Sequence, residues 1–343
     1  MNNNSRLPIS NDVCFAAIEQ AHARIKDKVK HTPIFSSSLL NDWLGHEIFF
    51  KAECLQNVGA FKLRGALSFI TKLEEKGQLP KEIVANSSGN HAQAVAYAAK
   101  QYNIPVTIFA SDTISPVKAA ATQYYGAKLR TFSTRLEADE AVQLASTKAG
   151  TVWIPPFNHV DIICGQGTAA LEAFKEIENI DAVFTPCGGG GLSAGTLICA
   201  KHFAATTEVI GVEPAAANDA AQSLRSGKIQ SLKQTPVTLA DGAATPKVGD
   251  ITFPFLQKLD GFYEVSEKHI AYWTQWLQHL LKLHVEPTSA MCMQANFEWL
   301  KKQKSKKRVL LILSGGNISA QSMQKIWAHD YLISPPMIQL DKK

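Results

Sequence analysis

Four consecutive glycines, Gly188 to Gly191, directly follow an apolar segment and open a predicted helix. Because glycine has no Cβ atom, neighbouring backbone N–H groups can converge on an anion, and the helix N-terminus adds partial positive charge. The run lacks the Gly-Lys-Ser/Thr ending of a nucleotide P-loop and the G-x-G-x-x-G spacing of a dinucleotide site. We therefore expect it to bind a single phosphate group. Taken alone, a tight turn for close helix packing is the alternative.

A second candidate is Lys62, which stands between a small-residue turn and an amphipathic helical segment. A cation is unfavourable at a helix N-terminus because that end carries partial positive charge. A Schiff base with an aldehyde cofactor that also bears a phosphate would remove the mismatch. A surface lysine that extends its charge into solvent is the ordinary alternative.

The segments that must position these residues alternate between short apolar runs and helical stretches. This order is typical of parallel sheets covered by helices, so the fold class is α/β. Predicted strands are 47–50, 83–85, 106–109, 128–131, 151–154, 182–185, 209–212 and 309–313. The four strands between 83 and 154 are evenly spaced, with helices predicted at about 90–102, 115–125 and 134–149. We expect a small domain, residues 82–158, inserted in a large domain formed by residues 1–81 and 159–343.

Composition narrows the class of protein. With 343 residues, 45% of them hydrophobic, and a net charge of +5, the chain is long enough for about two ordered domains. Six scattered cysteines without a C-x-x-C pair argue against a disulfide framework or a zinc site, which favours a cytoplasmic protein. The polar stretch 1–10 is interpreted as a disordered tail rather than a signal peptide, and no apolar run is long enough to span a membrane. The basic cluster 301–308 is interpreted as a solvated connection, not a nucleic-acid contact.

Seven motifs, in this order along the chain, closely resemble the serine/threonine dehydratase and serine racemase family of fold-type II pyridoxal 5′-phosphate (PLP) enzymes. The resemblance covers roughly residues 10 to 330. It implies two domains of the tryptophan synthase β type, PLP as cofactor, a small amino acid as substrate and a homodimer. The motifs are Gly59 to Ala66, Ser87 to Gln93, Gly165 to Thr168, Gly188 to Gly191, Leu239 to Gly242, Glu286 to Thr288 and Ser314 to Asn317.

The resemblance also implies roles for individual residues. The catalytic residues would be Lys62, which would carry PLP as a Schiff base and act as base when freed, and Ser88. The cofactor would be held by Phe61, Lys62, Asn90, Asn158, Gly188, Gly189, Gly190, Gly191, Leu192 and Ser314. The substrate would contact Ser87, Ser88, Asn90, His91 and Gly242.

The type of residue at position 314 bears on the reaction. A carboxylate facing the pyridine nitrogen keeps that nitrogen protonated and makes the ring a strong electron sink, whereas the neutral Ser314 hydroxyl would not. A less delocalised carbanion favours prompt loss of the β-hydroxyl over transamination. We therefore expect an ammonia-lyase that converts L-threonine, L-serine or both to 2-oxobutanoate or pyruvate plus ammonia.

Two alternatives share the same cofactor apparatus: serine racemase and 3-hydroxyaspartate dehydratase. Racemisation needs proton donors and acceptors on opposite faces of the cofactor, and in racemising relatives a serine at the position of Ser88 supplies the second face. Ala60 stands where relatives often have serine, which leaves the substrate preference open. Two alternative functions lie outside the dehydratases and racemases. One is a β-replacement enzyme of the cysteine synthase type, and the other is a non-enzymatic phosphate-binding protein.

A metal site is also predicted. Glu213 and Asp219 supply hard oxygen ligands six residues apart, and the Ala217 carbonyl with waters would complete a loop site for Mg²⁺, Ca²⁺ or Mn²⁺. The spacing matches the divalent-metal loop of the same relatives. Without that match, a solvated loop is the simpler interpretation. Two further features differ from the relatives. Ser319 stands beyond the Ser-Gly-Gly-Asn motif, where relatives commonly have aspartate. Isoleucine feedback inhibition is not expected, because no regulatory extension follows.

Overall fold

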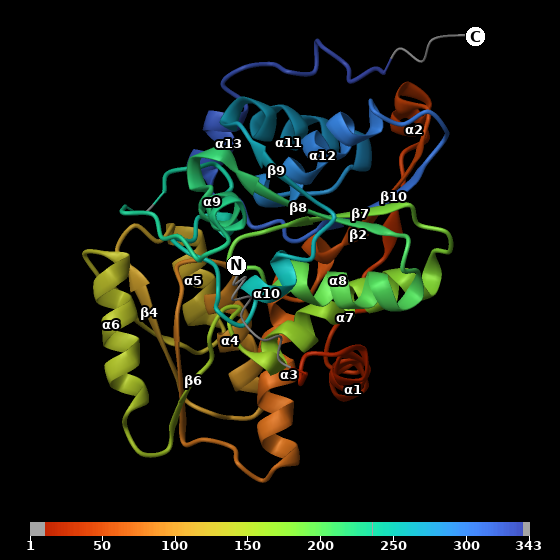
Figure 1. Cartoon of the computed structure of the whole chain (residues 1–343). Coiled ribbons are helices and arrows are strands. Elements are labelled where there is room, and N and C mark those ends of the chain that lie inside the picture. Colours follow the sequence, from red (N-terminus) through yellow and green to blue (C-terminus); the bar gives the residue numbers. More distant parts are fainter. Residues whose placement is uncertain (1–10, 235, 339–343) are drawn as a thin grey trace, which may run out of the picture.

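The computed structural model describes residues 11–234 and 236–338, so the predicted tail at 1–10 lies outside the described residues. The chain forms two sheets flanked by helices, a larger one with α7 and α8 on one side and α11 and α12 on the other, and a smaller one beside α6 (Figure 1). The six-stranded sheet has the order β1-β2-β10-β7-β8-β9, and the four-stranded sheet has the order β5-β4-β3-β6. Every strand pairing is parallel except that of β1 with β2.

The strands are short, and the central ones of each sheet are mostly apolar and buried, whereas β5 and β9 are largely exposed edge strands. In the larger sheet they are β1 (Ile34–Phe35), β2 (Glu47–Ala52), β7 (Ala182–Pro186), β8 (Glu208–Pro214), β9 (Gly261–Val265) and β10 (Arg308–Leu313). In the smaller sheet they are β3 (Glu82–Asn86), β4 (Val106–Ser111), β5 (Lys128–Phe132) and β6 (Thr151–Trp153).

The helices are mostly short connections between parallel strands. They are α1 (Phe15–Ile25), α2 (Ser38–Leu44), α3 (Lys62–Glu75), α4 (Asn90–Gln101), α5 (Pro116–Tyr124), α6 (Arg135–Ser146), α7 (Val160–Glu176), α8 (Gly191–Phe203), α9 (Asp219–Ser226), α10 (Phe253–Leu256), α11 (Glu267–Leu281), α12 (Pro287–Leu300) and α13 (Ala320–Ile326). The 3₁₀ turns in the described residues are η1 (Glu53–Leu55), η2 (Ala215–Ala217) and η3 (Asp241–Ala243).

Both faces of the larger sheet are buried, which explains its unbroken apolar strands. Alternate residues of β10 point to opposite faces: Val309 and Leu311 join the core beneath α2, α11 and α12, whereas Leu310 and Ile312 join the core beneath α1, α7 and α8. The smaller sheet packs one face on α3 and α4 and the other on α6. Parallel strands covered on both sides place their carboxyl ends, and the loops that follow them, along one edge.

The start of α3 is held by a buried ionic network. The Arg64 guanidinium donates hydrogen bonds to both carboxylate oxygens of Glu53 (2.7 and 2.8 Å) and of Glu172 (2.7 and 2.8 Å). The Lys51 amine lies 2.7 Å from Glu172, so two cations balance two carboxylates. Removal of one partner from such a network costs about 3–5 kcal/mol because an unpaired charge stays buried. The network ties the turn that contains Lys62 to β2 and α7.

Two glycines of α7, Gly165 and Gly167, let neighbouring helices approach closely. A Cβ atom at Gly165 would lie 2.5 Å from the Arg64 carbonyl oxygen, on α3. A Cβ atom at Gly195, on α8, would lie 2.6 Å from the Cα of Gly167. Side chains at these positions would therefore force α3 or α8 away from α7. The motif Gly165 to Thr168 thus has a packing role, besides supplying Gln166 and Thr168.

All eight predicted strands are present, and the expected parallel-rich α/β fold is confirmed. Strands β1 and β9 were not predicted, because β1 has only two residues and β9 is a half-exposed edge strand. The basic cluster joins α12 to β10, where Lys306 and Lys307 pair with Glu47 and Asp181. Across the described part of the chain, no helix is both long and apolar enough to cross a bilayer.

Candidate active site

Lys62 is the first residue of α3, and its side chain is half-buried. The amine donates a 2.7 Å hydrogen bond to the Pro156 carbonyl and lies 5.0 Å from the centre of the Phe61 ring. Burial lowers the pKa of this amine to about 7, against the attraction of Glu286, and the positive charge of Arg135 adds to the decrease. A substantial fraction of the free amine is therefore uncharged near neutral pH, as a nucleophile or base requires.

The glycine run forms the turn between β7 and α8. Gly190 has a φ of +92°, a conformation that other residues rarely adopt. A Cβ atom at Gly189 would overlap the Phe157 ring, and one at Gly191 would overlap the Gln166 side-chain oxygen. The turn is thus bare backbone at a helix N-terminus, where N–H groups lack partners within the helix. This arrangement fits a phosphate group, as predicted from the sequence.

Pro156 and Phe157 connect the lysine to the glycine turn. The Pro156 carbonyl accepts hydrogen bonds from both Lys62 and Gln166, and Phe157 packs against the glycines. Asn158 comes next and accepts a hydrogen bond from the Ile251 amide, 3.0 Å away. Residues 249–252 in turn contact the glycine turn, because the Thr252 hydroxyl donates to the Gly189 carbonyl at 2.6 Å. The structure therefore brings Lys62, Asn158 and the glycines together.

Ser314 reaches the same place from the end of β10. Its carbonyl accepts the Phe61 N–H at 2.9 Å, and its buried hydroxyl lies 3.0 Å from that of Ser289. Leu192 is buried in the first turn of α8. Among the described residues, no carboxylate is hydrogen-bonded to the Ser314 hydroxyl, so a group facing it would meet a neutral donor and acceptor.

The segment 87–91 forms the turn between β3 and α4. The Ser87 hydroxyl accepts the Gly89 N–H at 3.1 Å, and the Ser88 hydroxyl accepts the Ser111 N–H at 3.1 Å. As an acceptor, the Ser88 hydroxyl keeps its own proton available for donation. The first amides of α4, starting at Asn90, offer unpaired N–H groups to an anion.

His91 is fully buried near Lys62 and is uncharged. Burial, together with the charge of Lys62, lowers its pKa to about 3. Nε2 lies 2.9 Å from the Ile154 carbonyl oxygen, so Nε2 carries the hydrogen and Nδ1 is a buried acceptor without a described partner. His91 therefore orients the turn and offers an acceptor, not a positive charge.

Glu286 links the two sheets at the site; it belongs to one of the seven motifs, but no role of its own is predicted for it from the sequence. Both of its carboxylate oxygens accept hydrogen bonds from the Asn90 amide, at 3.1 and 3.0 Å, and one accepts the Asn317 N–H at 3.2 Å. Burial raises the pKa of Glu286 to about 7, and the nearby Asp241 adds to the increase. The proline after Glu286 marked it as a helix N-cap, which was the available sequence signal.

Gly242 lies in η3 beside this cluster. Its N–H donates to the Thr288 hydroxyl at 3.0 Å, and a Cβ atom there would lie 2.9 Å from the same oxygen. A Cβ atom at Gly188 would lie 3.2 Å from the neighbouring Ala243. Gly242 is therefore near the glycine turn, but its own N–H is already used.

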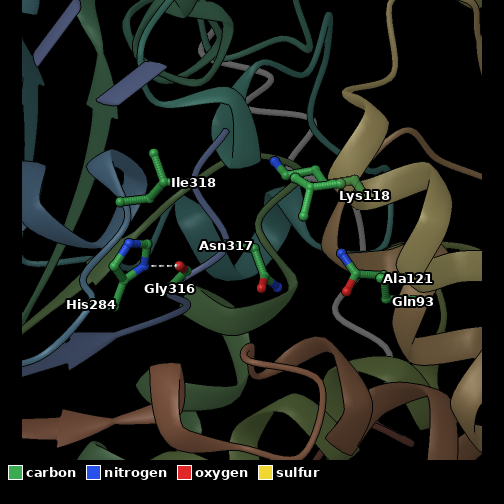
Figure 2. Close-up of a pocket in the computed structure, with 8 residues that line it drawn as sticks. Gln93, Lys118, Ala121, His284, Gly316, Asn317 and Ile318 are labelled. Atoms are coloured by element: carbon green, nitrogen blue, oxygen red, sulfur yellow. Dashed lines mark hydrogen bonds between the residues drawn. The ribbon is translucent and has the colours of Figure 1, made fainter. Parts of the chain in front are cut away.

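A pocket of about 240 Å³ borders the site. Figure 2 shows His284 and Ile318 on one side of it and Lys118 and Gln93 on the other, with Asn317 between them. Asn317 also donates a 2.9 Å hydrogen bond to Asn90. The pocket thus shares one wall with the Asn90 and Glu286 cluster.

The predicted metal residues are buried together at the end of β8. Glu213 accepts the N–H groups of Ala220 and Ala221, and an oxygen of Asp219 is buried without a described partner. Burial raises the pKa of Glu213 to about 9 and that of Asp219 to about 7. Ala217 is buried in η2 between them. Two buried carboxylates with an unpaired oxygen fit a divalent cation, although the described residues contain no cluster of three His, Cys, Asp or Glu side chains.

Comparisons with known proteins decide the family. A model described as pyridoxal-phosphate dependent enzyme matches residues 25–315. The chain is 41% identical over 308 residues to L-threo-3-hydroxyaspartate ammonia-lyase of Saccharomyces cerevisiae, covering 89% of this chain and 93% of that protein. It is 38% identical over 323 residues to serine racemase of Schizosaccharomyces pombe, covering 94% and 98%. This chain belongs to the pyridoxal-phosphate-dependent enzymes.

Comparison with solved structures supports the same family. The crystal structure of serine racemase from Dictyostelium discoideum matches with a TM-score of 0.82 at 37% identity, covering 90% of this chain and 99% of that one. The processed form of threonine deaminase isoform 2 from Solanum lycopersicum matches with a TM-score of 0.86 at 32% identity, covering 93% of each chain. The predicted family, fold type and PLP cofactor are therefore confirmed. The domain bounds and the individual residue roles stay predictions.

The lowered pKa of Lys62 predicts how the apoenzyme takes up PLP. Only the neutral amine attacks an aldehyde, so the uptake rate should rise with pH and level off just above pH 7, rather than climbing toward the ordinary lysine pKa of 10.5. Stopped-flow absorbance of PLP binding by the apoenzyme measures this profile. A rate that still increases tenfold per pH unit above pH 8 would contradict the lowered pKa.

The two buried carboxylates predict a metal effect on stability. Because their pKa values are raised, the folded protein binds more protons than the unfolded chain, and stability without metal should fall between about pH 5 and pH 9. Mg²⁺, Ca²⁺ or Mn²⁺ should raise the melting temperature most at the alkaline end, and Asp219→Asn should abolish this increase. Identical melting curves with chelator and with each cation would remove the metal site.

Proposed function

We propose that this enzyme is an ammonia-lyase that acts on small β-hydroxy amino acids, with 3-hydroxyaspartate and serine as its principal substrates. The observation that carries the proposal is the Lys62 amine, which is held by the Pro156 carbonyl beside the glycine turn and has a pKa near 7. The products would be ammonia with oxaloacetate from 3-hydroxyaspartate or pyruvate from serine. The long matches to a 3-hydroxyaspartate ammonia-lyase and to serine racemases support these two substrates.

When bound, PLP supplies an aldehyde that joins the substrate amine and a ring that withdraws electrons from Cα. In our proposal the glycine turn and the Leu192 amide bind its phosphate, Phe61 packs beside it, and Asn90, Asn158 and Ser314 position the ring. The freed Lys62 amine then removes the proton from Cα. Its burial supports this role, since a charged lysine could not accept a proton.

We assign the α-carboxylate of the substrate to the turn that contains Ser87, Ser88, Asn90 and His91. The unpaired amides at the start of α4 and the partial positive charge of that helix support this assignment. Gly242 would border the bound substrate without donating to it, because Thr288 already accepts its N–H. A divalent metal at Glu213, Ala217 and Asp219, a homodimer and a cytoplasmic location complete the proposal.

Serine racemisation is the second candidate function. The Ser88 hydroxyl accepts one backbone hydrogen bond and keeps a proton to donate, as the opposite-face acid of a racemase must. The full-length matches to serine racemases favour it.

Keto-acid release tests the primary proposal. The purified holoenzyme should form oxaloacetate from L-threo-3-hydroxyaspartate and pyruvate from L-serine, each with an equal amount of ammonia. L-Alanine, which has no β-hydroxyl group, is the matched control and should give no keto acid. If no β-hydroxy amino acid reacts although PLP is bound, the β-replacement reaction becomes the better interpretation.

Ser88→Ala separates the two candidate reactions. The variant should lose formation of D-serine from L-serine by about 100-fold, because general acid–base groups contribute roughly 10²–10⁴-fold, while pyruvate formation should stay within about tenfold. Chiral chromatography and a pyruvate assay on the same samples measure both. The control is Ser146→Ala, which removes a hydroxyl that bonds the Gln143 carbonyl at the end of α6 and should change neither rate. Wild-type enzyme that forms no D-serine would exclude racemisation.

A further inference from the structure

Thr252 contacts the glycine turn from the segment 249–252. It is fully buried and is the N-cap residue of α10. Its hydroxyl donates a 2.6 Å hydrogen bond to the Gly189 carbonyl and accepts the Gly249 N–H at 3.1 Å. The Gly249 carbonyl is a second acceptor but lies farther away, at 3.1 Å. Because a hydroxyl has one hydrogen to donate, that hydrogen is directed to the shorter contact, the Gly189 carbonyl.

This hydrogen bond fixes the orientation of the peptide group between Gly189 and Gly190. A trans peptide group is planar, and its C=O and N–H point in opposite directions. No peptide bond in the described part of the chain is cis. Since the Gly189 carbonyl is directed at Thr252, the Gly190 N–H points to the opposite side of the turn, where it donates to no acceptor among the described residues. It is therefore available to an anion at the start of α8.

A run of glycines needs such a restraint. Glycine has a wider range of backbone conformations than any other residue, so a peptide group between two glycines can rotate at little cost. Thr252 lies close enough to restrict the turn, because a Cβ atom at Gly190, whose φ is +92°, would lie 2.9 Å from the Thr252 hydroxyl oxygen. The Gly249 N–H also points at the Gly189 carbonyl, but from 3.3 Å. In the described structure, the Thr252 hydroxyl is thus the main restraint on the direction of the Gly190 N–H.

The same segment holds Asn158, which our proposal assigns to the cofactor ring. The Ile251 N–H donates to the Asn158 side-chain oxygen at 3.0 Å, and the Asn158 amide donates to Asp250 at 2.5 Å. A Cβ atom at Gly249 would lie 2.3 Å from the same Asn158 oxygen. Four consecutive residues therefore contact both the glycine turn and Asn158, and they set the spacing between the two.

We propose that Thr252 is the positioning residue of the phosphate site: its hydroxyl holds the Gly189 carbonyl so that the Gly190 N–H faces the phosphate of PLP. The inference rests on the assignment of the glycine turn to that phosphate in the proposed function, and it adds a residue that touches neither cofactor nor substrate. A turn that is oriented in advance binds its ligand more tightly, because binding need not restrict it. Thr252 should therefore contribute to the affinity for the phosphate group and not to the affinity for the ring and its aldehyde.

Pyridoxal, which is PLP without the phosphate, makes the role testable. Thr252→Val replaces the hydroxyl by a methyl group of similar size. It should weaken PLP binding to the apoenzyme by about tenfold, because a hydrogen bond to a buried carbonyl contributes roughly this factor. Pyridoxal binding should change by less than about twofold, since that ligand has no phosphate to accept the Gly190 N–H. Thr252→Ser keeps the donor and should bind PLP within about threefold of the wild type. Absorbance titration of the apoenzyme measures both dissociation constants.

The matched control is Thr196→Val, which removes a hydroxyl in the second turn of α8. Thr196 is equally buried, and its hydroxyl has no described hydrogen-bond partner, so both affinities should be unchanged. Inorganic phosphate gives a second readout, because it competes with PLP for the turn without reacting with Lys62. Its inhibition of PLP uptake should become about tenfold weaker in Thr252→Val and stay unchanged in Thr196→Val.

The outcomes separate this inference from the proposed function. A wild-type apoenzyme that binds PLP no more tightly than pyridoxal would overturn the assignment of the glycine turn to a phosphate, and the role of Thr252 with it. A wild-type enzyme that prefers PLP, but in which Thr252→Val keeps the same preference, would overturn the role of Thr252 alone. An equal loss of affinity for both ligands would show a general structural role and would also contradict the inference. Thr252→Ala removes the hydroxyl together with the methyl group and carries the same expectation if Thr252→Val does not fold.

Discussion

The burial of one amine, that of Lys62, is the constraint on which the rest of the site depends. An exposed lysine is charged at neutral pH and neither attacks an aldehyde nor accepts a proton. Here burial brings the pKa to about 7, and the Pro156 carbonyl orients the amine. The surrounding fold keeps this placement: Arg64 anchors α3 by its two carboxylate partners, and Gly165 lets α3 lie close against α7.

The site is built from both sheets. The glycine turn and Ser314 come from the larger sheet, whereas Ser88 and Asn90 follow β3 of the smaller one. Glu286 joins the two through its hydrogen bonds to Asn90, and Lys118 and Arg135 cross the same boundary to reach Asp241 and Ala244. These contacts connect the two sheets at the site.

The fold could be predicted largely from the sequence, because parallel strands buried on both faces are apolar throughout and stand out from their helical connections. Strand β9 could not be predicted, because its residues are half-exposed and do not form a continuous apolar run. Lys62 and the glycine turn could be found because a cation at a helix start and four glycines are locally unusual. Pro156 could not be found, since it acts through its backbone carbonyl.

Covalent mapping of the cofactor tests the central claim most directly. Borohydride reduction of the holoenzyme, followed by digestion and peptide mass spectrometry, should place the reduced pyridoxyl group on Lys62 alone, with one group per chain. Loss of the absorbance band of bound PLP in Lys62→Ala would accompany this result. A pyridoxyl group on any other lysine, or an unmodified Lys62 in active enzyme, would contradict the account.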